Sequence, residues 1–163
     1  MMAIQTLSQR VGDCLLVRQL MLVTAESCTG GWVAQAVTAE AGSSQWFERG
    51  FVTYSNAAKM ELLGVLPETL ERYGAVSEAT VREMAEGALR HSHAQLAVAV
   101  SGIAGPGGGS LEKPVGTVCL AWARAGWATQ TQCIHFLGNR DAIRRQAVAA
   151  ILQGILDYLH DEP

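Results

Sequence analysis

The stretch LMLVTAESCTGGWVAQAV, residues 20–37, joins a short apolar segment to an amphipathic one through a turn of small residues. Residues 20–25 are typical of a strand that is buried on both faces. Thr29 is a candidate cap for the helix that follows, and Gly42 is expected to end that helix. The turn between the two elements carries Ser27 and Cys28. Ligands of α/β sheets bind at the carboxyl ends of strands, so this turn is the first candidate for chemistry.

Strands and helices continue to alternate on both sides of this stretch. Further strands are predicted over 49–55 and 95–101, and residues 116–136 are typical of a hairpin that turns near Ala125 and Gly126. The helices are expected near 7–15, after Asn56 as a cap, from Pro67, after Ser77 as a cap, and from Asp141. This order predicts an α/β fold: a mixed sheet of about five strands between two helical layers, α/β/α.

Composition and charge limit the class of protein. The chain has 163 residues, of which 49% are hydrophobic and 17% charged, so we expect one domain over residues 1–163 with a substantial core. The formal net charge is −3 and no basic run occurs, which disfavours a nucleic-acid partner.

The spacing of the cysteines indicates whether the chain has a metal site or disulfides, and the length of its apolar runs bears on membrane association and location. The four cysteines are far apart and form no C-x-x-C pair, so we expect neither a zinc site nor a disulfide framework. No apolar run reaches 18 residues and the beginning of the chain does not resemble a secretory leader, so we expect no membrane association and a cytoplasmic location.

The turn at Ser27 has a catalytic and a structural interpretation. The N–H groups of Gly30, Gly31 and Trp32 stand at a helix start, where they could bind an anion or an oxyanion. The alternative is a capped helix start whose small residues serve packing. The segment does not match the G-x-S-x-G elbow of esterases, because Ala25 and Thr29 occupy the glycine positions.

A serine nucleophile needs a base, and no histidine motif accompanies Ser27. Lysine is rare in this chain: ten of the twelve basic residues are arginine, and only Lys59 and Lys113 are lysine. Lys59 is expected in the first turn of its helix, where the helix dipole, together with burial beside Tyr54, lowers the pKa of the ammonium group. Tyr54 could relay a proton or hold the lysine in place. The alternative is a solvated lysine in an arginine-rich chain.

Two further segments have the composition of a ligand-binding site. The loop SGIAGPGGGSLEKPVGT, residues 101–117, carries six glycines and two prolines, which suits close backbone approach to a phosphate or a sugar, although a flexible connection is the alternative. It matches neither the dinucleotide nor the P-loop fingerprint. In GNRDAIRR, residues 138–145, Arg140, Arg144 and Arg145 are candidate phosphate ligands, or solvated helix residues.

Four motifs in order resemble the CinA C-terminal domain family: AESCTGG, FVTYSNAAK, SGIAGPGGG…EKPVGT and GNRDAIR. The resemblance spans nearly the whole chain, and the chain is similar to the stand-alone members of that family. It implies hydrolysis of the carboxamide of nicotinamide mononucleotide, with Ser27, Lys59 and Tyr54 as the catalytic residues. No metal and no organic cofactor is implied.

The resemblance also implies a substrate-binding segment that begins at Ser101, and one departure is visible. The late motif more often reads Gly-Asp-Arg in the family, whereas Asn139 replaces the acid here. The substrate-binding residues expected from the chain and the family together are Thr29, Gly30, Gly31, Phe51, Ser101, Gly102, Gly105, Arg140 and Arg144. Phe51, Trp46 and Trp32 are candidate aromatic neighbours of a cationic pyridinium ring.

Two other functions remain open at this point. A nucleotide-binding regulatory module without turnover would not require Ser27, Tyr54 and Lys59 together. A cysteine amidase would use Cys28, but again no histidine motif accompanies it. The partners expected are a small-molecule substrate and a second copy of the chain in a homodimer.

Overall fold

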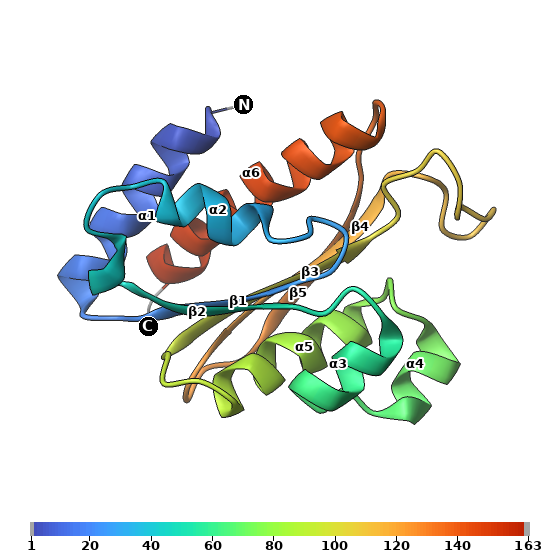
Figure 1. Ribbon diagram of the computed structural model, residues 1–163, viewed down its shortest axis with the longest axis horizontal. Helices are drawn as coiled ribbons and strands as arrows, with labels where there is room; N and C mark the ends of the chain where they lie inside the picture. Colours follow the sequence, from blue (N-terminus) through green and yellow to red (C-terminus); the bar gives the residue numbers. More distant parts are fainter. Residues whose placement is uncertain (1, 162–163) are drawn as a thin grey trace.

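A computed structural model describes residues 2–161 and shows one mixed sheet between two layers of helices (Figure 1). The strands lie in the order β2-β1-β3-β4-β5, with β1, β2 and β3 parallel and β4 and β5 antiparallel to their neighbours. Their bounds are β1 Leu22–Glu26, β2 Phe47–Val52, β3 Leu96–Gly102, β4 Thr117–Arg124 and β5 Gln130–His135. The predicted α/β/α architecture and the hairpin after Gly116 are therefore confirmed.

The helices divide between the two faces of the sheet. On one face lie α1 (Ile4–Arg18), α2 (Trp32–Thr38) and α6 (Arg140–His160); on the other lie α3 (Asn56–Leu63), α4 (Pro67–Tyr73) and α5 (Glu78–Arg90) (Figure 1). A short 3-10 helix, Ser43–Gln45, precedes β2. Within residues 2–161 no helix combines the length and the apolar character that crossing a bilayer requires.

The central strands separate two cores because their side chains alternate. In β3, Val98 and Val100 face the core under α1 and α6, whereas Ala97 and Ala99 face the core under α5. All five residues of β1 are buried. Because both faces of β1 and β3 are covered, these strands are mostly apolar in the sequence, and their polar residues Thr24, Glu26 and Ser101 are buried as well.

Besides the start of α6, which lies at Arg140 rather than at Asp141, three local predictions need correction. Gly31, not Thr29, is the N-cap residue of α2, and the helix ends at Thr38 rather than at Gly42. The cap of α3 is Ser55, whose side chain accepts a hydrogen bond from the N–H of Ala58; Asn56 is already the first helical residue. All three errors are shifts of one to a few residues at helix ends, where the local signals are weakest.

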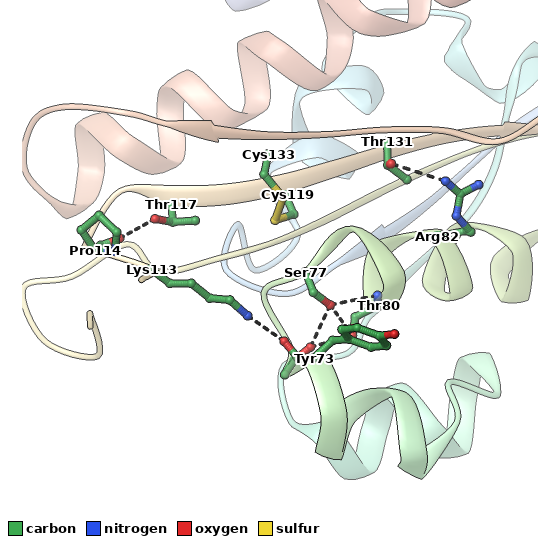
Figure 2. The surroundings of a disulfide bond; sticks show 11 residues. Tyr73, Ser77, Thr80, Arg82, Lys113, Pro114, Thr117, Cys119, Thr131 and Cys133 are labelled. Carbon is green, nitrogen blue, oxygen red and sulfur yellow. Dashed lines mark hydrogen bonds between the residues drawn. A yellow bond between two sulfur atoms is a disulfide. The ribbon is translucent and has the colours of Figure 1, made fainter. Parts of the chain in front are cut away.

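A disulfide joins Cys119 of β4 to Cys133 of β5, contrary to the expectation of none (Figure 2). The two residues are direct partners in the antiparallel register, and their Cα atoms lie 4.0 Å apart. Strand register rather than sequence spacing makes them neighbours, and the cysteine pattern alone does not reveal register.

The packing of α5 against α3 leaves no room for a side chain at Gly87. A Cβ atom at this position would overlap the carbonyl oxygen of Leu63. We expect Gly87→Ala to lower the free energy of unfolding by about 3 kcal/mol, at the upper end of overpacking effects. Urea denaturation measures this, and Gly107→Ala is the matched control because no atom lies within 4 Å of the place that its Cβ would take. Equal stability of the two variants would contradict this packing.

Candidate active site

A pocket of about 210 Å³ opens at the carboxyl ends of β1 and β3. Its walls come from the turn after β1, the β2–α3 connection, the α4–α5 connection, the end of β3 and the start of α6. The lining residues are Ser27, Cys28, Tyr54, Asn56, Lys59, Ala75, Val76, Ser101, Gly102, Ala104 and Arg140. Segments far apart in the sequence meet here because parallel strands end at one edge of a sheet.

Ser27 and Lys59 meet in this pocket. Lys59 Nζ lies 3.0 Å from Ser27 Oγ and donates to the carbonyl oxygen of Thr53 at 2.9 Å. The carbonyl oxygen of Tyr54 lies at 3.5 Å. A neutral amine has two N–H groups and one lone pair. With the two carbonyl oxygens taking the N–H groups, the lone pair is free to accept the hydroxyl proton of Ser27.

Burial, rather than the helix start, lowers the pKa of Lys59. The side chain is only 1% exposed, and no carboxylate within residues 2–161 forms an ion pair with it. Removing an ammonium group from water without a counter-charge disfavours the charged form, so the pKa lies below that of an ordinary lysine. The direction of the shift agrees with the sequence prediction, which gave the helix start and burial as its two causes; of these, burial is the larger.

Cys28 lines the same pocket, but its thiol is poorly suited to attack. The side chain is buried, and burial raises its pKa to about 11. The thiolate is the nucleophilic form of cysteine, and at neutral pH this residue stays a thiol. The geometry therefore favours Ser27 over Cys28.

Glu26 is a residue that the sequence interpretation missed. Its carboxylate is fully buried and accepts hydrogen bonds from Thr29 Oγ1 at 2.6 Å, the N–H of Val33 at 2.9 Å and the N–H of Ala34 at 3.1 Å. Thr29 is thus a donor within the turn and does not line the pocket. An acidic residue at the end of a fully buried, mostly apolar strand was the available signal.

The predicted oxyanion site at the start of α2 is not present in the expected form. The N–H of Gly30 donates to the carbonyl oxygen of Ser27, and the N–H of Trp32 donates to that of Thr29. Gly30 and Gly31 have positive φ angles of 60° and 103°, and neither lines the pocket. The two glycines are needed for the conformation of the turn, because residues with a side chain rarely adopt positive φ angles.

Arg140 and Tyr54 form one wall of the pocket. Arg140 donates to the carbonyl oxygen of Gly105 at 2.9 Å and to the hydroxyl of Tyr54 at 3.2 Å. The Tyr54 side chain is 62% exposed, so its hydroxyl lies at the mouth of the pocket and is bonded to Arg140 rather than to Lys59. Asn139, the departure from the family motif, caps α6 by accepting from the N–H of Ala142.

The other expected binding residues lie elsewhere. Arg144 donates to the carbonyl oxygens of Cys28 and Thr29 on the outer side of the turn. Phe51 packs against the core under α5, Trp46 is buried against α1, and Trp32 lies beside two arginines. Tyr54 is therefore the only aromatic residue among those that line the pocket.

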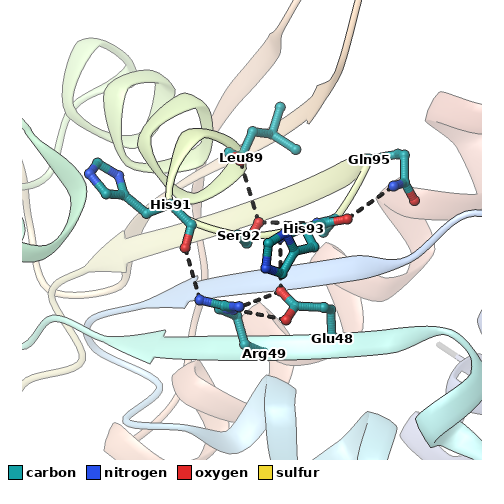
Figure 3. A network of polar contacts seen from close by, with 8 residues as sticks. Glu48, Arg49, Leu89, His91, Ser92, His93 and Gln95 are labelled. Atoms are coloured by element: carbon teal, nitrogen blue, oxygen red, sulfur yellow. Dashed lines mark hydrogen bonds and ion pairs between the residues drawn. The ribbon is translucent and has the colours of Figure 1, made fainter.

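No histidine is among the residues that line the pocket of Ser27. His91 and His93 belong to a network with Glu48 and Arg49 at the amino ends of the strands, the edge opposite the pocket (Figure 3). His135 on β5 contacts the carbonyl oxygen of Val115. No group of three or more His, Cys, Asp or Glu side chains in the described part of the chain could hold a metal ion.

Fold and pocket together define an α/β protein with a serine–lysine pair at the carboxyl edge of its sheet. The CinA C-terminal domain matches residues 4–159, and the chain belongs to that family. It is 59% identical to nicotinamide-nucleotide amidohydrolase PncC of Escherichia coli K12, covering 90% of this chain and 89% of the relative. It is 55% identical to the PncC protein of Enterobacter agglomerans, covering 92% of each.

A solved structure supports the same assignment. The competence/damage inducible protein CihA of Agrobacterium tumefaciens superimposes with a TM-score of 0.93 at 47% identity. The superposition covers 97% of this chain and 96% of that protein. The family expected from the four sequence motifs is therefore confirmed.

Proposed function

We propose that this chain is a nicotinamide-nucleotide amidohydrolase that converts nicotinamide mononucleotide and water into nicotinate mononucleotide and ammonia. The observation that carries the proposal is the 3.0 Å contact between Ser27 Oγ and a buried lysine amine in the pocket. Identity of 59% to a protein named for this activity supports the choice of substrate.

The proposed reaction passes through an ester of Ser27. Lys59 accepts the hydroxyl proton as Ser27 Oγ attacks the carboxamide carbon, and it then donates that proton to the leaving nitrogen, so that ammonia departs. Water next attacks the acyl-enzyme with Lys59 again accepting a proton, which passes to Ser27 Oγ as the ester bond breaks; the carboxylic acid product then loses its own proton to solvent and leaves as the carboxylate. These steps require no metal and no organic cofactor.

Tyr54 is proposed to act at the mouth of the pocket rather than in proton transfer to Lys59. Its hydroxyl is held by Arg140 and its ring is the nearest candidate to stack on the pyridinium. Ser101, Gly102 and Gly105 are proposed to contact the substrate through the end of β3 and the glycine loop. A homodimer, a cytoplasmic location and a single domain over 1–163 stay predictions.

A regulatory module that binds the nucleotide without turnover is the alternative. Binding alone would not need a lysine that is 1% exposed and placed on a serine hydroxyl, because burying an unpaired ammonium group costs free energy. Ammonia release from nicotinamide mononucleotide, compared with release from free nicotinamide, separates the two functions. Binding of the mononucleotide without any ammonia would support the regulatory module.

Arg140 is proposed to bind the 5′-phosphate, because it is the only arginine among the residues that line the pocket. Nicotinamide riboside should then be a poorer substrate by about 10- to 100-fold in kcat/KM, since each charge-assisted hydrogen bond contributes roughly 1.5–3 kcal/mol. Arg140→Ala should raise KM for the mononucleotide and change KM for the riboside little. Steady-state kinetics on both compounds measures this.

The control for this variant is Arg145→Ala. Arg145 lies on the same helix but pairs with Asp141 at 3.6 Å and does not line the pocket. Equal kcat/KM on the two compounds in the unmodified protein would exclude a phosphate site at Arg140.

A further inference from the structure

We infer that Glu26 and Arg144 are positioning residues that hold the turn of residues 27–31 from two sides. They keep Ser27 Oγ within hydrogen-bonding distance of Lys59 Nζ. Neither residue lines the pocket, and the inference rests on the proposed function. It also replaces the phosphate-binding role expected for Arg144 from the sequence.

Glu26 holds the turn from the inside. Its carboxylate takes three hydrogen bonds, two of them from N–H groups at the start of α2 that have no partner within the helix. Bonds from N–H groups to a carboxylate are stronger than neutral ones, and the helix start favours a negative charge there. The N–H of Ser27 donates to the carbonyl oxygen of Val100, so the residue next to Glu26 is also tied to β3.

Arg144 holds the turn from the outside. Its Nε donates to the carbonyl oxygen of Cys28 at 3.0 Å, and one terminal nitrogen donates to that of Thr29 at 3.2 Å. The guanidinium carbon also lies 5.3 Å from the centre of the Trp32 ring, a cation–π contact. The planar guanidinium group offers two N–H groups to these carbonyl oxygens in a fixed fork, a geometry that the single nitrogen atom of a lysine does not reproduce.

The contacts of Glu26 and of Arg144 both fix the position of one atom, Ser27 Oγ. Residues 27–31 contain two glycines with positive φ, so the turn itself resists displacement weakly. A misplacement of about 1 Å in a reacting group can lower the rate about 100-fold. Loss of either contact should therefore lower kcat and leave KM nearly unchanged.

Arg144→Ala and Arg145→Ala form a matched pair that tests the inference. Both arginines lie near the Trp32 ring, at 5.3 and 5.1 Å, but only Arg144 bonds the turn. We expect Arg144→Ala to lower kcat about 10- to 100-fold on nicotinamide mononucleotide and equally on the riboside, with KM within about threefold. Arg145→Ala should keep the unmodified kcat. An increase in KM for the mononucleotide alone would make Arg144 a phosphate ligand and overturn the inference.

Glu26→Gln is the corresponding test on the inner side. The amide keeps one oxygen for two of the donors and places an NH₂ group against the third, so we expect kcat to fall by roughly tenfold with KM unchanged. A Glu26→Gln enzyme with unmodified kcat would overturn the role of Glu26. Where Arg144→Ala does not fold, Arg144→Lys replaces it, because lysine keeps the charge but not the fork.

Labelling of Ser27 by phenylmethanesulfonyl fluoride, followed by mass spectrometry, tests the inference without the nucleotide. We expect slower labelling in Arg144→Ala than in the unmodified protein and in Arg145→Ala. A protein that is labelled at Ser27 but releases no ammonia would refute the proposed function alone. Equal labelling rates in all three proteins would refute the positioning role alone.

Discussion

Ser27→Ala is expected to abolish ammonia release from nicotinamide mononucleotide, whereas Cys28→Ala retains most of it. The two side chains line the same pocket, but only the Ser27 hydroxyl lies 3.0 Å from the amine of Lys59. Loss of a serine nucleophile lowers kcat by roughly 10⁴- to 10⁶-fold in enzymes of this type. A coupled ammonia assay at saturating substrate measures the difference.

The comparison with Cys28 makes this expectation specific. Its thiol has a pKa of about 11 because it is buried, so it contributes volume to the pocket wall rather than a nucleophile. Calorimetric binding of the mononucleotide to Ser27→Ala should persist, since the variant removes one oxygen atom. A folded Cys28→Ala protein without activity, together with an active Ser27→Ala protein, would reverse the assignment.

Lys59→Arg and Lys59→Ala are both expected to bind the substrate and fail to hydrolyse it. Arginine stays protonated in proteins, unlike the neutral amine of the working lysine, so it cannot accept a proton from Ser27. Alanine removes the amine altogether. We expect kcat to fall by about 10³-fold or more in both, a loss close to that of Ser27→Ala because the two residues act as a unit.

Lys59→Met serves as the control for packing at this site. Its unbranched side chain fills much of the space of the lysine stem in a position that is 1% exposed, without an amine. Circular dichroism shows whether the Met and Ala variants fold. If both fold and are equally inactive, the loss of activity is due to the missing amine. An active Lys59→Arg enzyme would refute the serine–lysine mechanism.

The pH dependence follows from the lowered pKa of Lys59. The protonated amine cannot accept a proton, so activity should be low in acid, rise with pH as the amine becomes neutral, and persist into the alkaline range. The midpoint should lie below the ~10.4 of a free lysine. The chain has only two lysines, so NMR titration of their side chains, assigned with Lys59→Met, measures the same pKa directly.

Much of the fold was predictable because its signals are local. Mostly apolar runs marked β1 and β3, Ser77 and Pro67 marked two helix starts, and the two-strand pattern after Gly116 marked the hairpin. Such signals arise from the spacing of apolar residues along a helix or strand and from the residue types at its two ends. Both depend only on a few neighbouring residues. The same reasoning made Ser27 and Lys59 candidates, one by its place at a turn and the other by its rarity, but left a structural alternative open for each; the resemblance to the CinA C-terminal domain family assigned them together.

The tertiary structure alone decided which of the candidates meet. Ser27 and Lys59 are 32 residues apart, and Arg144 reaches the turn from 116 residues away. Strand register likewise made Cys119 and Cys133 partners. The amount of water around a side chain depends on the whole packing, so the burial that lowers the pKa of Lys59 and raises that of Cys28 could not be read from their neighbours in the sequence. The sequence by itself determined the elements and the residue types available, and the packing of distant segments determined which of them share a pocket and in which state of charge.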